Sequence, residues 1–324
     1  MLSRLTLVMF SVLVVVEVLG AAQAKGGTPI STCGQTVTTS AVLTQDLACT
    51  GDGIVVGAEG VTIDLKGFVI RGDRGSGDWG IDNSAGHDKL TVKNGVLRNF
   101  ERGVYAGSGA DKTSISNVIA SGNSGYGIYV VGDSASVKSV TASGNSTGVY
   151  LEGDQASVKR TTAAGNTSYG IYLYGPSASI QSSIAVGNGR GIYVYGDSAS
   201  VKGSTASGNT LYPSVSVGIH VDGNAASIKS STASGNAAEG IYVWGDEASI
   251  QSSTAIGNYD HGIQIHGDAA KVKGNQTDGN GFAAGGSDFS ALGIVVTDFT
   301  TAPEGVNSAH GNDDPVECNP ASLC

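Results

Sequence analysis

The chain has 324 residues, of which 50 are glycine and only 14% are charged. Hydrophobic residues make up 40%, which excludes a disordered chain, and the glycines keep no three-residue period, which excludes collagen. The net charge of −10 argues against nucleic acid as a partner, because that partner normally requires a basic patch.

The first 24 residues have the features of a secretory signal peptide. Arg4 supplies the positive start, the run from Leu5 to Leu19 is mostly apolar, and Ala22-Gln23-Ala24 forms a small-x-small cleavage site. We expect the mature chain to begin at Lys25 and to be secreted, periplasmic or on the cell surface, with no membrane span left. An uncleaved anchor is the alternative, although the apolar run is short for a span and contains Glu17.

Four cysteines lie at the two ends of the mature chain. Cys33 and Cys49 stand near its start, and Cys318 and Cys324 at its end. Four cysteines allow three pairings, so the sequence leaves the connectivity open. Local pairs are the simplest, and each would staple one end of the molecule. Neither pair has close histidines at ligand spacing, so we predict no metal site there.

Between about residues 100 and 285 the chain repeats a short motif. Each copy begins with Gly-Ile or Gly-Val, most copies continue with Tyr, and the spacings between the glycines are 21, 22, 21, 27, 22 and 22. The copies begin at Gly127, Gly148, Gly170, Gly191, Gly218, Gly240 and Gly262, with weaker ones at Gly103 and Gly293. A fixed period of this size predicts a solenoid.

The local pattern within each copy is that of β-strands. Residues alternate with period two, which places Ile128 and Val130 on one face and Tyr129 on the other. The following runs place Val137 and Ala142 inside. We predict three short strands and three turns per unit, with coils stacked about 4.8 Å apart around an Ile/Val/Ala core.

The repeated Gly-Asn followed by Gly-Ile-x-Val, with the opening segment Val61-Thr-Ile-Asp-Leu-Lys-Gly-Phe-Val-Ile, resembles right-handed parallel β-helix proteins of the pectin-lyase-like superfamily. The resemblance covers roughly residues 50–300. It implies an all-β fold, a single-stranded right-handed parallel β-helix of about ten coils of ~22 residues. It implies no single function, since this architecture hosts lyases, hydrolases, epimerases, adhesins and structural spikes.

The domain organisation follows from these segments. We expect a signal peptide at 1–24, an N-terminal cap with the first strands at 25–60, the parallel β-helix at 61–300, and a C-terminal tail or cap with a cysteine pair at 301–324.

Equivalent positions in a solenoid form ladders, and two of these consist of turn-forming residues. The asparagine ladder is Asn123, Asn145, Asn166, Asn188, Asn209, Asn236, Asn258 and Asn280. The turn aspartates are Asp133, Asp154, Asp197, Asp246 and Asp268. Both sets are interpreted as structural, because stacked amides and turn carboxylates bond nearby backbone. We expect no cofactor; a calcium site at the aspartates stays open, although the nine-residue pattern of calcium-binding β-rolls is absent.

The strand that carries the repeated tyrosine presents two outward columns. The first reads Tyr105, Tyr129, Tyr150, Tyr172, Tyr193, His220, Tyr242, Gln264, and the second reads Val131, Glu152, Tyr174, Tyr195, Asp222, Trp244, His266. The rings could simply cover the sheet, or they could form a platform on which sugar rings stack. Under the second interpretation the substrate-binding residues are Tyr172, Tyr174, Tyr193, Tyr195, Asp222, Trp244, Gln264 and His266.

Two repeats are longer than the others, by insertions at 210–217 and 281–292 in the same turn. Inserted loops often carry sites on a rigid scaffold, so these two would wall a groove of about three coil steps. The polar residues expected to act in that groove as catalytic acids and bases are Glu239, Asp260, His261, His220 and Tyr242. A chance cluster of polar residues on an exposed sheet is the alternative.

Two enzyme groups with this scaffold provide a comparison. In polygalacturonases, acids and a histidine stand just before the Gly-hydrophobic strand, and Glu239-Gly240 and His261-Gly262 occupy similar places. The chain departs from that pattern, because Val217 precedes Gly218 where an acid is expected and no Arg-Ile-Lys stands near Gly293. The Asp-Pro-His-Asp motif of alginate-epimerase-like enzymes is also missing.

Three functional hypotheses therefore stay open. The favoured one is a secreted glycan-binding β-helix protein that takes a polysaccharide or cell-surface glycan in the groove, with polysaccharide lyase, epimerase or hydrolase activity as an extension of it. A non-catalytic adhesive surface protein and a purely structural protein are the alternatives. The acidic net charge disfavours a polyanionic ligand without a bridging cation.

Overall fold

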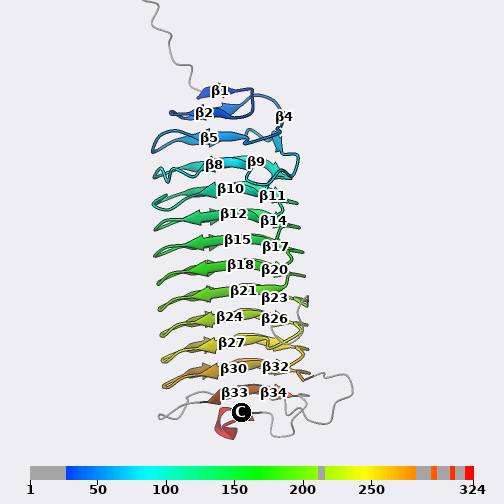
Figure 1. Ribbon diagram of the computed structural model, residues 1–324. Coiled ribbons are helices and arrows are strands. Elements are labelled where there is room, and N and C mark those ends of the chain that lie inside the picture. The colour runs from blue at the N-terminus through cyan, green and yellow to red at the C-terminus, as the bar shows by residue number, and fades with distance from the viewer. Residues whose placement is uncertain (1–26, 211–215, 282–292, 298–306, 311–317) are drawn as a thin grey trace, which may run out of the picture.

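Short strands rich in Ile, Val, Tyr and Thr stack on one another from one end of the chain to the other. The computed structural model describes residues 27–210, 216–281, 293–297, 307–310 and 318–324. The coils form one elongated stack that runs from β1 to the C-terminus (Figure 1). The predicted signal peptide and Lys25 lie outside the described residues.

One sheet contains the tyrosine-bearing strands, which all pair in parallel. Its 13 strands are β2 (Gln35–Val37), β5 (Ile54–Val56), β8 (Trp79–Asn83), β10 (Arg102–Ala106), β12 (Tyr126–Val131), β15 (Thr147–Glu152), β18 (Tyr169–Tyr174), β21 (Arg190–Tyr195), β24 (Ile219–Asp222), β27 (Ile241–Trp244), β30 (Ile263–His266), β33 (Ile294–Thr297) and β35 (Cys318–Asn319). We call it the tyrosine sheet.

The other sheet wraps around the rest of each coil and is also parallel. Its 22 strands are β1 (Thr28–Ile30), β3 (Ala41–Leu43), β4 (Leu47–Ala48), β6 (Thr62–Asp64), β7 (Val69–Arg71), β9 (Thr91–Arg98), β11 (Ser114–Ser121), β13 (Ser136–Lys138), β14 (Thr141–Ser143), β16 (Ser157–Lys159), β17 (Thr162–Ala164), β19 (Ser179–Gln181), β20 (Ile184–Val186), β22 (Ser200–Lys202), β23 (Thr205–Ser207), β25 (Ser227–Lys229), β26 (Thr232–Ser234), β28 (Ser249–Gln251), β29 (Thr254–Ile256), β31 (Lys271–Lys273), β32 (Gln276–Asp278) and β34 (Ser308–His310). Two strands per coil belong to it, except that β9 and β11 each cover both positions and that β1 and β34 each stand alone in the described part of their coils.

The predicted all-β right-handed parallel β-helix is confirmed. Within the described ranges the only helix is the 3₁₀ turn η1 (Ala321–Leu323), and no helix there is both long and apolar enough to cross a membrane. The predicted number of coils was too low, because the 13 strands of the tyrosine sheet make about twelve turns rather than ten. The first coils, β2 and β5, pair in the same sheet but lack the repeated Gly-Ile-Tyr motif that the count relied on.

The core follows the predicted alternation. Ile128, Val130, Val137 and Ala142 are at most 1% exposed, and Lys138 points outward. Burying each Ile or Val contributes roughly 1.5–3 kcal/mol, and every coil adds such residues against its two neighbours. The stack is therefore stabilised one coil at a time along its length.

The asparagine ladder is buried and joins each coil to the next. The Oδ1 atom of Asn166 accepts hydrogen bonds from the backbone N–H of Asn145 at 3.0 Å and from its side-chain amide at 3.1 Å. The side-chain amide of Asn166 in turn donates to Ala142 O at 3.1 Å and to Asn188 Oδ1 at 2.8 Å. These bonds satisfy buried polar groups, which supports the structural interpretation of the ladder.

The motif glycine is required by the same ladder. A Cβ atom on Gly191 would lie 2.3 Å from the backbone oxygen of Gly218 and 2.7 Å from Nδ2 of Asn209. Only a residue without a side chain allows the coils to approach this closely. The Gly that opens each Gly-Ile-Tyr copy is therefore determined by packing between coils.

The turn aspartates form a second ladder, on the outside. Asp133 Oδ1 accepts the backbone N–H of Asp154 at 2.8 Å, and Asp246 Oδ1 accepts that of Asp268 at 2.8 Å. The predicted structural role of these carboxylates is consistent with these bonds.

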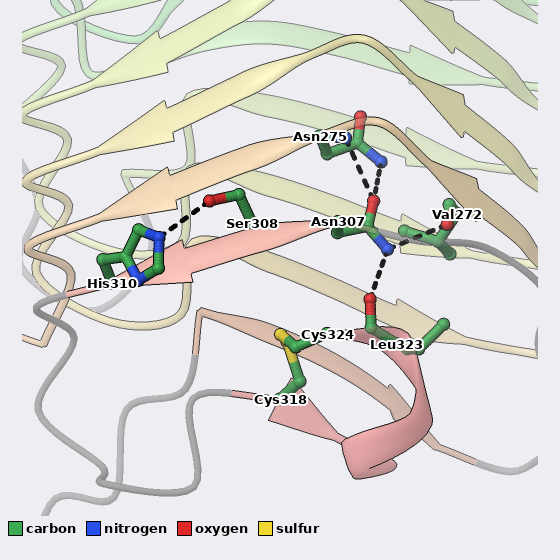
Figure 2. Close-up of a disulfide and its surroundings, with 8 residues drawn as sticks. All are labelled: Val272, Asn275, Asn307, Ser308, His310, Cys318, Leu323 and Cys324. Carbon is green, nitrogen blue, oxygen red and sulfur yellow. Dashed lines mark hydrogen bonds between the residues drawn. A yellow bond between two sulfur atoms is a disulfide. The ribbon is translucent and has the colours of Figure 1, made fainter.

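A disulfide lies at each end of the described coils. Cys33 pairs with Cys49, with Cα atoms 5.6 Å apart, and Cys318 pairs with Cys324, with Cα atoms 6.0 Å apart. These are the local pairs that the sequence left as the simplest choice. Figure 2 shows how the C-terminal pair lies against the last coils, where the Asn307 side chain donates to Val272 O and to Leu323 O.

Asn166→Ala tests whether the ladder holds the coils in register. The variant leaves the backbone N–H of Asn145 without an acceptor and its side-chain amide with Ala120 O alone, and each unsatisfied buried group costs about 1–3 kcal/mol. We expect a lower free energy of unfolding in urea by at least that amount. Thr167→Ala, at the exposed neighbouring position, is the control. Equal losses in the two variants would contradict the structural role.

Candidate functional site

The two outward columns that the sequence predicts are present on the tyrosine sheet. The strand register places Tyr193, His220, Tyr242 and Gln264 in successive coils of the first column. The imidazole of His220 lies between two phenol rings, with centroid distances of 4.5 Å to Tyr193 and 4.7 Å to Tyr242. The rings along this column pack mostly edge to face, so they cover the sheet as well as one another.

The second column is more exposed. Tyr174, Tyr195 and Trp244 are 42%, 43% and 59% exposed, whereas the first column is half-buried. The register places Asp222 between Tyr195 and Trp244. This column therefore offers aromatic surface to a ligand.

A third outward column was predicted only at Glu239 and His261, and its earlier members were missed. It contains Trp79, Arg102, Tyr126 and, further along, Tyr169 and Arg190, which stand directly before the motif glycine. If inward and outward residues alternated strictly, counting back from each motif tyrosine would place the residue before the glycine on the inward face. In the structure the Gly and the following Ile or Val are both buried, so the alternation breaks there and the preceding side chain points outward. Two consecutive inward residues at a glycine are the signal that could have revealed it.

Where the three columns meet around β24, the surface is hollowed. The hollow has a volume of about 390 Å³. Its lining residues are Arg190, Tyr193, Val217, His220, Asp222, Glu239, Tyr242 and Trp244. Aromatic walls, two carboxylates and one guanidinium thus converge on one concave surface, which is the usual composition of a ligand site.

The hollow keeps His220 neutral. Burial lowers the pKa of His220 to about 4, and the nearby Arg190 guanidinium acts in the same direction. Arg190 is itself held by the Tyr169 hydroxyl and lies over the Tyr169 ring at 5.2 Å. At neutral pH the His220 imidazole therefore has a ring nitrogen able to accept a proton or a hydrogen bond.

The two carboxylates respond to burial in the opposite direction. Burial raises the pKa of Asp222. It also raises the pKa of Glu239, with the Asp260 carboxylate adding to the effect and a hydrogen bond from the Glu239 backbone opposing it. A carboxyl group that keeps its proton more readily than usual is suited to act as a hydrogen-bond donor or a general acid.

The structure does not bring all the predicted site residues into this hollow. Glu239 and His261 occupy equivalent places in adjacent coils, since Gly218 N–H donates to Glu239 O and Gly240 N–H to His261 O. His261 pairs with Asp260 at 3.7 Å, and neither lines the hollow.

The remaining predicted residues lie beside the hollow. His266 packs against Trp244, with ring centroids 5.4 Å apart, and its ring nitrogens contact Thr297 Oγ1 at 2.6 Å and Gln264 Nε2 at 2.9 Å. Tyr172 is half-buried in its column, where burial raises its pKa to about 12.

Most of the two predicted loop walls fall outside the described residues, namely 211–215 and 282–292. Among the residues that the structure does describe, no three His, Cys, Asp or Glu side chains are grouped so that they could hold a metal ion.

The pKa of His220 gives a direct test of the hollow. Because the folded-state value of about 4 lies below the ordinary 6.5, the unfolded chain binds the extra proton first as the pH falls. Between pH 6.5 and 4 this group should therefore lower stability, by on the order of 3 kcal/mol over the whole window. We expect an NMR titration midpoint near 4 for His220, and a smaller loss of stability over the same window in His220→Gln. A midpoint near 6.5 would contradict the burial of the ring.

Comparisons with known proteins agree with this architecture. Residues 79–221 match the family model described as the right handed beta helix region, and no curated protein sequence is significantly similar to the chain. Similar solved structures include the A-modules of the Azotobacter vinelandii mannuronan C-5 epimerases AlgE6 and AlgE4, with TM-scores of 0.58 and 0.57 and identities of 13% and 14%. In both cases 86% of this chain aligns with 88% of the other. At these identities the likeness concerns the fold alone, and together with the match over the repeats it leads to one conclusion: the chain has the fold of a right-handed parallel β-helix repeat protein.

Proposed function

We propose that the protein binds a polysaccharide or cell-surface glycan in the hollow around β24. The observation that carries this proposal is the meeting of the rings of Tyr193, Tyr242 and Trp244 with Asp222 and Glu239 on one concave surface. Sugar rings combine apolar faces, which stack on aromatic rings, with hydroxyl groups, which bond carboxylates and imidazoles. The fold shared with the two epimerase modules supports the proposal, because both are mannuronan C-5 epimerases and mannuronan is a polysaccharide.

The proposal includes a location outside the cytoplasm. Both disulfides are of the kind that persists in an oxidising compartment, and the sequence begins with the expected signal peptide over residues 1–24. Extracellular or cell-surface glycans would be accessible there.

Trp244→Ala tests the binding surface. The indole is 59% exposed and lines the hollow, so its removal takes away stacking area without opening the core. We expect at least a tenfold loss of affinity for whichever polysaccharide of a panel the protein binds, measured by affinity electrophoresis and calorimetry, since one aromatic stacking contact contributes about 0.5–1.5 kcal/mol beyond area burial. Lys202→Ala, on the other sheet, is the control and should bind as the unaltered protein does. Unchanged binding in Trp244→Ala would reject this surface and favour the structural or adhesive alternative.

Turnover in the same hollow is a second candidate function. The observation that favours it is that a neutral His220 and Glu239, whose pKa is raised, line the same hollow, because a lyase, epimerase or hydrolase requires a base and an acid within reach of one substrate. Asp260 and His261 would belong to the edge of this site on the next coil.

Assays on the polysaccharide that binds would decide this point. We expect Glu239→Gln and His220→Gln to lower turnover by 100-fold or more, a much larger effect than their effect on affinity, as general acid–base groups contribute about 10²–10⁴-fold. Circular dichroism of both variants should match the unaltered protein. A protein that binds but gives no product with any member of the panel would leave glycan binding without catalysis.

A further inference from the structure

A second hollow crosses the same coil on the other side of Asp222. Its volume is about 520 Å³, and its lining includes Tyr195, Asp197, Asp222, Asn224 and Trp244. Asp222 and Trp244 line the first hollow as well, so the two hollows adjoin at β24.

Two aromatic rings form the walls of this second hollow. Tyr195 and Trp244 are paired with Asp222 from the coils on either side, so they stand two strand spacings apart, about 9.6 Å. Carbon atoms in contact lie about 3.5–4.0 Å apart. The gap therefore accommodates one ring between the two walls, with Asp222 as its floor.

Each wall is supported from behind. Tyr174 stacks on Tyr195 with centroids 5.0 Å apart and planes within 4°, and His266 lies behind Trp244 at 5.4 Å and 30°. The supporting rings belong to the coils on the far sides, so the ring faces that remain uncovered are turned toward Asp222. A preorganised pair of faces binds a ligand with little ordering cost.

Three successive positions at the edge of the hollow cannot carry side chains. Gly196, Gly223 and Gly245 follow the three column residues directly, and a Cβ atom on Gly223 would lie 2.3 Å from Gly196 O. The close approach of the coils requires glycine here, and it keeps the entrance open.

The charge of the hollow is negative. Asp222 forms the floor and Asp197 the rim, and no Lys, Arg or His is among the residues that line it within the described part of the chain. Two aromatic faces and two carboxylates attract a cation, through the ring quadrupoles and through direct charge pairing. A uronate would instead bring its carboxylate against Asp222.

We propose that this slot binds a glycan residue with a free amine, a protonated hexosamine whose ring lies between Tyr195 and Trp244 and whose ammonium pairs with Asp222. This inference rests on the proposed function and specifies the class of glycan that the surface takes.

Calorimetry with three oligosaccharides of equal length tests the inference: a glucosamine oligomer in a buffer in which its amines are protonated, the N-acetylglucosamine oligomer, and a mannuronate oligomer. We expect the glucosamine oligomer to bind about tenfold more tightly than the acetylated one, which is the scale of a cation–π contact joined to a charge pair. The mannuronate oligomer should bind most weakly.

Variants separate the charge from the walls. Asp222→Asn should abolish the preference for the amine, so that the glucosamine and acetylated oligomers bind with equal affinity, and Tyr195→Leu should weaken both while it keeps the preference. Asp154→Asn, an exposed turn carboxylate on another coil, is the matched control and should change neither.

The outcomes distinguish the two proposals. The amine inference is overturned if the acetylated or the mannuronate oligomer binds as tightly as the glucosamine oligomer, or more tightly. If that binding is lost in Trp244→Ala, glycan binding at this surface still stands. Absence of binding by every oligosaccharide and every polysaccharide of the panel would overturn both.

Discussion

The register of each coil on the next is the constraint on which the rest of the structure depends, and the buried asparagine ladder holds it. Each ladder amide bonds both the backbone and the side chain of its neighbour, as Asn209 accepts two hydrogen bonds from Asn188. A slip of one residue would turn the inward Ile and Val outward and would leave these buried amides unpaired. Because register is fixed inside the coil, outward positions can change without changing the fold.

The candidate site arises from one such change. The coils of β21 and β27 each present two aromatic rings, Tyr193 with Tyr195 and Tyr242 with Trp244, whereas the coil between them presents His220 and Asp222. Smaller polar side chains between two aromatic rows leave the two adjoining hollows. The same enclosure lowers the pKa of His220 and raises that of Asp222, so the shape and the electrostatics of the site have one origin.

The fold and the two principal columns could be predicted because a solenoid repeats its pattern, and each repeat confirms the last. The outward position of Arg190 could not be predicted in this way. It depends on a break in the alternation at Gly191, where two consecutive residues are buried, and a strict period of two does not allow such a break. The early coils were undercounted because β5 and its neighbours reach the same geometry with different residues. Glu239 lies in the hollow and His261 beyond it because His261 stands one coil further from β24 and pairs with Asp260, and the extent of the hollow along the stack is not determined by spacing along the chain.

Charge distinguishes the two sides of the coil. The larger sheet carries an outward column of lysines in which Lys138, Lys159, Lys202 and Lys229 recur in register, while the turn after the tyrosine sheet carries the aspartate ladder. The long-range field of such rows attracts opposite charge and repels like charge before any contact forms. At a distance, such rows would favour the approach of a cationic chain over a polyanionic one to the face that carries Trp244. The fold shared with the epimerase modules does not decide between these faces; the sign of the charge on the ligand does.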